Sequence, residues 1–176
     1  MKKSSLQAVV LCLFVSGMCS EEISAADITL FTGIQNPGKL TIDNVVRDTK
    51  LGGVFGARFS RGQVIGFEQT LAYSPKFLES GRQAFNAQSN LHVGIPAGRV
   101  VPYATAGIGF ISTFGDELNF GDIGTKFTVN YGGGIKFKNL AGPLGLRFDV
   151  RGYSVPDVFS QTLNFVEGSV GLLLSF

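Results

Sequence analysis

The stretch GLRFDVRGY, residues 145–153, alternates strictly between apolar and charged side chains over six consecutive positions. The apolar positions are Leu146, Phe148 and Val150, and the charged ones are Arg147, Asp149 and Arg151. Alternation with a period of two is the pattern of a strand that buries one face and exposes the other. The stretch therefore predicts a strand, and it raises the question of which face points toward water.

The composition excludes two broad classes of protein. The chain has 176 residues, of which 44% are hydrophobic, 16% are charged and 24 are glycine. No apolar run of 18 or more residues lies beyond the N-terminal region, which argues against a protein that crosses a membrane with helices. The net charge is only +2, and no basic stripe with interleaved aromatic residues is visible. A nucleic-acid partner is therefore not expected.

The N-terminal residues have the pattern of a secretory signal peptide. Lys2 and Lys3 supply positive charge, residues 6–15 are apolar, and the small residues at 24–26 suit a cleavage site. Both cysteines lie in this segment, so a mature chain without disulfides or thiols is expected. The sequence predicts a signal peptide over 1–26 and one exported domain over 27–176.

Eight alternating segments follow, separated by turn-forming residues. The predicted strands cover 27–35, 50–59, 63–73, 86–96, 100–112, 125–138, 144–154 and 163–176. Long connections at 36–49, 74–85, 113–124 and 155–162 alternate with short ones at 61–62, 97–99 and 139–143. This regularity is typical of an up-and-down antiparallel barrel, because all tight turns then share one rim and all free loops share the other.

Alternate residues of each predicted strand form an apolar face, whereas the residues between them form a face with charges, polar groups and glycine. A secreted soluble ligand-binding barrel would show the same alternation turned inside out. Lipid on the apolar side is favoured by the signal peptide, by apolar-face aromatics near strand ends, and by polar-face glycines that leave room for long side chains in a narrow lumen. Turning Arg147 toward lipid at mid-membrane would also cost about 2–4 kcal/mol. The predicted fold is all-β, an eight-stranded antiparallel up-and-down transmembrane β-barrel.

Several segments carry a family resemblance: PYATAGIGF (102–110), NYGGGIKF (130–137), GLRFDVRGY and the C-terminal phenylalanine. With them, the predicted mature chain resembles the small OmpA/OmpX-type outer-membrane β-barrel proteins. The resemblance implies a Gram-negative outer membrane, contact with its lipid and lipopolysaccharide, and a monomer. It also implies that the barrel-assembly machinery recognises alternate C-terminal residues, here Val170, Leu172, Leu174 and Phe176. The chain departs from the family in lacking tryptophan for the aromatic girdles, and no following domain for peptidoglycan attachment is expected.

The same resemblance implies that paired charges fill the lumen. The matching positions are Arg58, Glu68, Lys136, Arg147, Asp149, Arg151 and Glu167. Buried charges are tolerated when they are paired and hydrogen-bonded, and these positions form a nearly neutral set. A structural plug is the first interpretation, and a narrow or gated channel for ions or small solutes is the alternative.

Residues suited to catalysis are scarce. His92 is the single histidine. Its place in the alternation of its strand predicts that it faces the lumen, away from the lipid substrate of a lipid A deacylase. No enzymatic activity, metal or cofactor is expected. The long loops are the predicted contact surface for lipopolysaccharide, divalent cations or an outside partner. Their candidate residues are Phe77, Arg82, Phe114, Asp116, Glu117 and Phe120. The predicted function is therefore structural or surface interaction, without catalysis.

Overall fold

The computed structural model describes residues 26–36, 39–42, 45–48, 51–77, 82–115, 124–158 and 161–176. Within these ranges the backbone forms β1 (Ala26–Asn36), β2 (Lys39–Ile42), β3 (Val45–Asp48), β4 (Gly52–Arg61), β5 (Ile65–Ser74), β6 (Arg82–Gly94), β7 (Val100–Gly115), β8 (Thr125–Ala141), β9 (Leu144–Val158) and β10 (Gln161–Ser175). No helix in the described ranges is long and apolar enough to span a membrane. Residues 1–25 lie outside these ranges, and Ala26, the last residue of the predicted signal peptide, begins β1.

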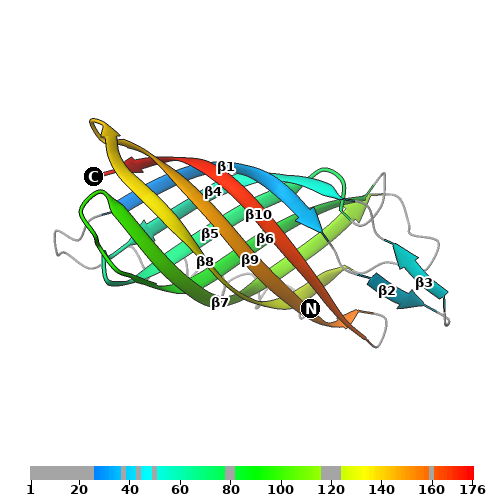
Figure 1. Cartoon of the computed structure of the whole chain (residues 1–176). Helices are drawn as coiled ribbons and strands as arrows, with labels where there is room; N and C mark the ends of the chain where they lie inside the picture. The colour runs from blue at the N-terminus through cyan, green and yellow to red at the C-terminus, as the bar shows by residue number, and fades with distance from the viewer. Residues whose placement is uncertain are drawn as a thin grey trace, which may run out of the picture.

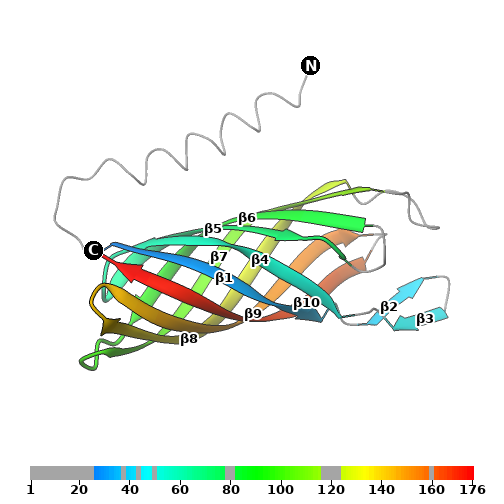
Figure 2. The same ribbon diagram turned by 90° about the horizontal axis from the view of Figure 1, so that it is seen from above.

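Eight of the strands close into one barrel in the order β1-β10-β9-β8-β7-β6-β5-β4. All pairs between neighbours are antiparallel, and the pairing of β1 with both β4 and β10 closes the ring. Figures 1 and 2 show these strands tilted around a single barrel. The predicted eight-stranded antiparallel barrel is confirmed.

Short turns gather at one end of the barrel, here called the turn end. The turns after β4, β6 and β8 contain Gly62, Gly98 and Gly142, with φ angles of 97°, 65° and 63°. Glycine adopts such positive φ values without the steric strain that a Cβ atom causes. The ends of the β1–β10 pair also meet here, where the backbone N–H of Phe176 donates to the carbonyl of Ala26 at 2.9 Å.

The opposite end, here called the loop end, contains an element that the sequence pattern did not predict. Residues 36–49 were expected to form a loop, but β2 and β3 pair there as a two-stranded hairpin, with Lys39 opposite Asp48. Figure 1 shows this hairpin beyond the rim of the barrel. Each of these strands has only four residues, the lower limit for an alternating run that predicts a strand, so the segment was assigned to a loop.

A second difference concerns residues 155–162, also predicted as a loop. Here β9 continues to Val158 and β10 starts at Gln161. This stretch contains Pro156 and Asp157, which the strands accommodate through an irregularity in which Asp157 adopts φ 58° and the β9–β10 register shifts. Proline and positive-φ residues are tolerated at such bulges because ladder hydrogen bonds are interrupted there.

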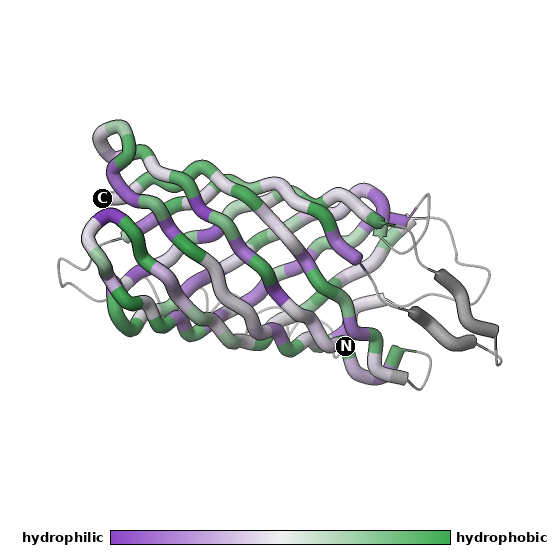
Figure 3. Tube along the Cα trace, viewed as in Figure 1, coloured by the Kyte–Doolittle hydropathy of each residue, from purple (hydrophilic) through white to green (hydrophobic). Residues whose placement is uncertain are grey.

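The two faces of the barrel wall differ in polarity as predicted. Figure 3 shows polar and apolar residues alternating along the strands. On β9, the outward-facing Phe148 and Val150 are exposed, whereas Arg147, Asp149 and Arg151 are buried inside. Aromatic pairs near the strand ends add to the outer surface, among them Phe110 on Phe127, with ring centroids 5.9 Å apart. The apolar face is therefore outside and the charged face lines the lumen.

Candidate functional site: the lumenal charge belt

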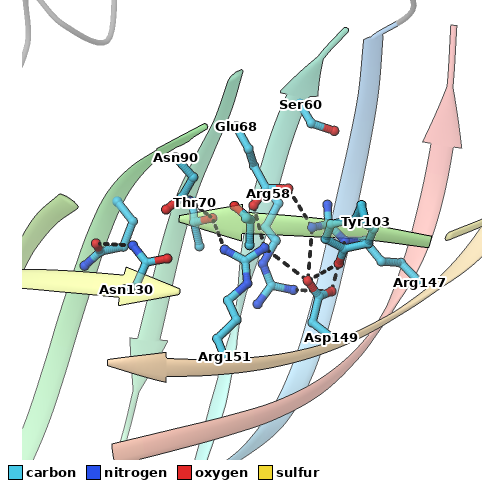
Figure 4. A network of polar contacts seen from close by, with 12 residues as sticks. Arg58, Ser60, Glu68, Thr70, Asn90, Tyr103, Asn130, Arg147, Asp149 and Arg151 are labelled. Atoms are coloured by element: carbon cyan, nitrogen blue, oxygen red, sulfur yellow. Dashed lines mark hydrogen bonds and ion pairs between the residues drawn. The ribbon is translucent and has the colours of Figure 1, made fainter. Parts of the chain in front are cut away.

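Six charged residues meet in the middle of the lumen and are here called the charge belt. They are Arg58 on β4, Glu68 on β5, Arg147, Asp149 and Arg151 on β9, and Glu167 on β10. All six occupy inward-facing positions of their strands, and none is more than 4% exposed. Figure 4 labels five of them, all except Glu167, and shows them pointing toward one another from β4, β5 and β9. The belt has three cations and three anions, so its formal charge is zero.

Glu68 joins two arginines from the opposite side of the barrel. Its Oε2 lies 2.6 Å from Nη2 of Arg147, and its Oε1 lies 2.5 Å from Nη2 of Arg151. Arg147 and Arg151 are four residues apart on β9, so their side chains leave the strand on the same face. One carboxylate therefore bridges both guanidinium groups across the lumen.

Asp149 is the second bridge of the belt and lies between these arginines on β9. Its carboxylate accepts hydrogen bonds from Arg147 at 2.9 Å, from Arg151 at 3.0 Å and from Arg58 at 3.1 Å. Arg58 in turn donates to Oε1 of Glu167 at 2.6 Å, and its guanidinium lies 3.6 Å from the ring centroid of Phe31. The belt is thus one continuous network that connects β4, β5, β9 and β10.

A tyrosine that the sequence pattern did not single out completes the network. The hydroxyl of Tyr103, on β7, donates to Asp149 and accepts a hydrogen bond from Nε of Arg147 at 2.9 Å. Gly134 on β8 leaves the space for it, because a Cβ atom there would lie 2.6 Å from the tyrosine oxygen. This contact bears out, at one position, the prediction that inward glycines make room for long side chains.

Lys136 was predicted to belong with these charges, but it lies in a separate group. Its Nζ donates to Oδ2 of Asp27 at 2.9 Å and to Oγ of Ser60 at 3.0 Å, and Nζ of Lys138 lies 2.8 Å from Oδ1 of Asp27. Asp27, Lys136 and Lys138 form what is here called the turn-end cluster. The sequence pattern missed Asp27 as a partner because it lies at the start of its strand and next to the predicted cleavage site.

Between the charge belt and the loop end, an apolar cluster fills part of the lumen, beside buried polar side chains such as Asn86 and Gln88. The residues of this apolar cluster are Phe77, Ala84, Ile111, Tyr153, Val155, Val158, Leu163 and Phe165, and all are at most 3% exposed. Tyr153 stacks on Phe165 with ring centroids 4.7 Å apart, and Phe77 meets Phe165 edge-on at 5.6 Å. Because these residues continue the inward-facing rows, aromatic rings occupy part of the lumen above the belt.

The residues predicted to form the loop contact surface fall into three groups. Phe77 and Arg82, predicted as exposed, are each 2% exposed; Phe77 packs in the apolar cluster, and Arg82 begins β6 on an inward position, so this part of the prediction is wrong. Phe114 is 43% exposed and lies 6.3 Å from the ring of Tyr73 on the outer face. The remaining candidates, Asp116, Glu117 and Phe120, lie outside the described residues.

The C-terminal residues proposed as an assembly signal lie on β10 or directly after it. Val170 and Leu172 are exposed on the outer face, Leu174 is half-buried there, and Phe176 is 68% exposed. Because β10 pairs with β9 on one side and β1 on the other, these residues flank the seam at which the barrel closes.

The described residues offer little for catalysis or metal binding. No group of three or more histidine, cysteine, aspartate or glutamate residues that could hold a metal occurs among them. His92 is 1% exposed inside the lumen, and its ring lies 5.6 Å from that of Tyr103. Neither of its ring nitrogens has a hydrogen-bond partner among the described residues, so the structure shows no nucleophile paired with it.

Comparison with known proteins identifies likenesses of structure, whereas no family model and no curated protein matches the sequence. The structure resembles Neisserial surface protein A with a TM-score of 0.63 and 11% identity, over 87% of this chain and 97% of the other. It resembles the N-terminal β-barrel domain of Pseudomonas aeruginosa OprF with a TM-score of 0.56 and 14% identity, over 86% and 97%. It also resembles the outer membrane enzyme PagL with a TM-score of 0.52 and 15% identity, over 84% and 98%. The chain therefore has the fold of the small outer-membrane β-barrels.

Proposed function

We propose that this chain is an outer-membrane protein with a structural or surface-interaction role, and that its lumen is a plug and not a channel. The charge belt carries this proposal. Its charges cancel, nearly every charged group has an ion pair across the lumen, and the apolar cluster lies above it toward the loop end. Moving one of these side chains aside would leave an uncompensated charge in a poorly hydrated interior, which is strongly unfavourable.

Conductance across a planar lipid bilayer tests the plug. The unmodified protein is expected to show no stable conductance. The neutral pair of substitutions Glu68→Ala with Arg151→Ala removes two long side chains without adding net charge, and it should produce discrete openings. Val150→Ala, on the outer face of the same strand, is the matched control and should remain silent. Folding of each variant is checked by its migration in electrophoresis with and without heating. Steady openings of the unmodified protein would favour the alternative function, a narrow channel for ions or small solutes.

We also propose that the loop end faces outward from the cell and forms the contact surface. Short turns on the periplasmic side and long connections outside are the general rule for bacterial outer-membrane barrels. The hairpin of β2 and β3 and the exposed Phe114 then face lipopolysaccharide headgroups or an outside partner. An epitope inserted between Ile42 and Val45 should be labelled on intact cells, and the same epitope inserted after Gly142 should be labelled only after the outer membrane is opened. The reverse pattern would contradict this orientation.

The outward row on β10 supports a role in assembly. We expect deletion of Phe176, or Phe176→Ser, to leave export intact and to lower the fraction of heat-modifiable, folded barrel in the outer membrane. Phe148→Leu, which changes another outward phenylalanine away from the chain end, serves as the control. Assembly of the truncated chain at the level of the parent would rule out recognition of the C-terminal residues Val170, Leu172, Leu174 and Phe176.

A role without catalysis is part of the same proposal. The likeness to an outer membrane enzyme extends to the fold, but His92 lies inside the lumen, and no nucleophile is hydrogen-bonded to it in the described residues. Purified barrel incubated with lipid A is expected to release no fatty acid, and release that is lost in His92→Asn would contradict this expectation.

A further inference from the structure

The turn end of the lumen contains a pocket of about 130 Å³ that none of the roles above uses. Asp27, Lys136 and Lys138 of the turn-end cluster line it together with His92. Gln63, from the turn after β4, and Asn139, near the end of β8, contribute to its wall. A volume of this size accommodates several water molecules or one small polyatomic ion.

The two lysines retain donors that their protein contacts do not use. An ammonium group has three N–H donors. Nζ of Lys136 donates to Asp27 and Ser60, and Nζ of Lys138 donates to Asp27, at 2.8 to 3.0 Å. Both carboxylate oxygens of Asp27 are occupied by these contacts. The pocket therefore presents two ammonium groups and one carboxylate, a surplus of one positive charge with donors to spare.

His92 is a second and independent indication of a ligand. Its side chain lines the pocket and is 1% exposed, yet neither Nδ1 nor Nε2 has a hydrogen-bond partner in the part of the chain that the structure describes. Buried polar side chains nearly always have such a partner, because an unmade hydrogen bond costs about 1–3 kcal/mol. A neutral imidazole has one N–H donor and one acceptor nitrogen, so it can donate to an oxygen atom in the pocket.

We propose that this pocket binds a small oxyanion, a carboxylate or phosphate group that enters from the turn end. Its oxygen atoms accept hydrogen bonds from Lys136, Lys138 and the ring N–H of His92. A cation is disfavoured, because Asp27, the one carboxylate among the described residues that line the pocket, is already held by both lysines. The anion comes either from a dissolved molecule on that side of the membrane or from the headgroup of a lipid beside the rim.

The imidazole signals of His92 can report anion binding at the pocket without ambiguity, because His92 is the only histidine in the sequence. Protein labelled with ¹⁵N-histidine, free of any histidine tag, is folded in a maltoside detergent that carries no phosphate. Inorganic phosphate, and separately acetate, is then titrated at constant ionic strength adjusted with chloride. The expected result is a saturable shift of the imidazole signals with both oxyanions and none with chloride alone. The proposal would be overturned if neither oxyanion shifts the imidazole signals saturably in detergent and the signals are also unshifted in the lipid bilayers described below.

A matched pair of lysine variants tests the assigned donors. Lys138→Gln should weaken phosphate binding about tenfold, the effect of one hydrogen bond between charged groups. Lys126→Gln, on the same strand near the loop end, should leave the affinity unchanged. Equal affinities of the two variants would show that the shift reports binding elsewhere and would overturn the site. If Lys138→Gln does not fold, the titration of the parent protein alone decides.

The source of the anion is distinguished by the surrounding lipid. The signals in phosphatidylglycerol bilayers without added anion are compared with those in the maltoside detergent. Signals already at the phosphate-saturated position would support the pocket and identify a lipid headgroup as the source. Signals that reach that position only after phosphate is added would support the pocket and identify a dissolved anion.

Discussion

The charge belt and the apolar cluster occupy neighbouring parts of the same lumen and are packed by opposite means. The belt packs six charged side chains whose stability depends on each cation meeting an anion. The cluster packs rings and aliphatic groups, which require complementary shape and volume but no particular partner. The two regions show that a narrow barrel can be filled by either chemistry, but that the belt, unlike the cluster, joins distant strands through pairs of opposite charge.

The difference also predicts how each region responds to change. Removing one charge leaves an opposite charge buried without full compensation, and that penalty exceeds the loss of the contact itself. Removing part of an apolar side chain costs the lost burial plus whatever cavity remains. Substitutions in the belt should therefore be more costly than substitutions of similar volume in the cluster.

The largest effect is expected for Glu68→Gln. The substitution preserves volume but leaves Arg147 and Arg151 with only Asp149 between them, so we expect a loss of about 3–5 kcal/mol in the free energy of unfolding. Reversible denaturant unfolding in lipid vesicles measures it. The double variant Glu68→Gln with Arg147→Met restores neutrality and should cost less than the sum of its single variants. Simple additivity would mean that the belt is not an electrostatic unit.

The next largest effect is expected for Phe148→Arg, which tests whether a cation is tolerated on the outer face, where the belt offers no anion. Phe148 lies between Arg147 and Asp149 in sequence but on the outer face, where it is 47% exposed. Phe148→Arg places a cation against lipid and should cost about 2–4 kcal/mol near the midplane. The same vesicle unfolding assay applies, with Phe148→Leu as the control for lost aromatic area. A cost no greater than that of the leucine variant would contradict the assignment of the outer face.

The smallest effect is expected in the apolar cluster. Phe165→Leu keeps an apolar side chain but removes two aromatic contacts, with Tyr153 and Phe77, so we expect a loss of about 1–2 kcal/mol. Vesicle unfolding measures the loss, and Val166→Leu, on the outer face of the same strand, is the control. A loss as large as that of Glu68→Gln would remove the distinction between the two regions.

The face of the barrel wall to which each side chain points was predictable from sequence, but the partner of each charged side chain was not. Residues 146–151 were assigned to the correct faces because the direction of a side chain on a strand alternates locally. Their partners depend on how eight strands are staggered when the barrel closes, which no local pattern records. For this reason the contact of Arg151 with Glu68 was not derivable from the chain, and Lys136 was grouped with the belt although it pairs with Asp27.

The errors at the loop end have a related cause. Phe77 and Arg82 lie among turn-forming residues and were predicted to be exposed. However, β6 already begins at Arg82, and Phe77, which follows the end of β5 at Ser74, packs against Phe165. The extension of β9 contributes Val155 and Val158 to the apolar cluster, which Phe77 joins from a distant part of the chain. Strand ends set by such contacts are not visible in local alternation.

The sequence by itself determined the architecture. Alternating segments of suitable length, tight glycine turns and charges confined to one face of the strands are consistent with few folds other than this barrel. The tertiary structure decided which charges meet, where an apolar cluster adjoins them in the lumen, and that His92 and two lysines line one pocket at the turn end. The physical reason is one of range. Side-chain direction and turn geometry are properties of a few consecutive residues, whereas the distance across the lumen between two side chains is set only when β1 pairs with β10 and the ring closes.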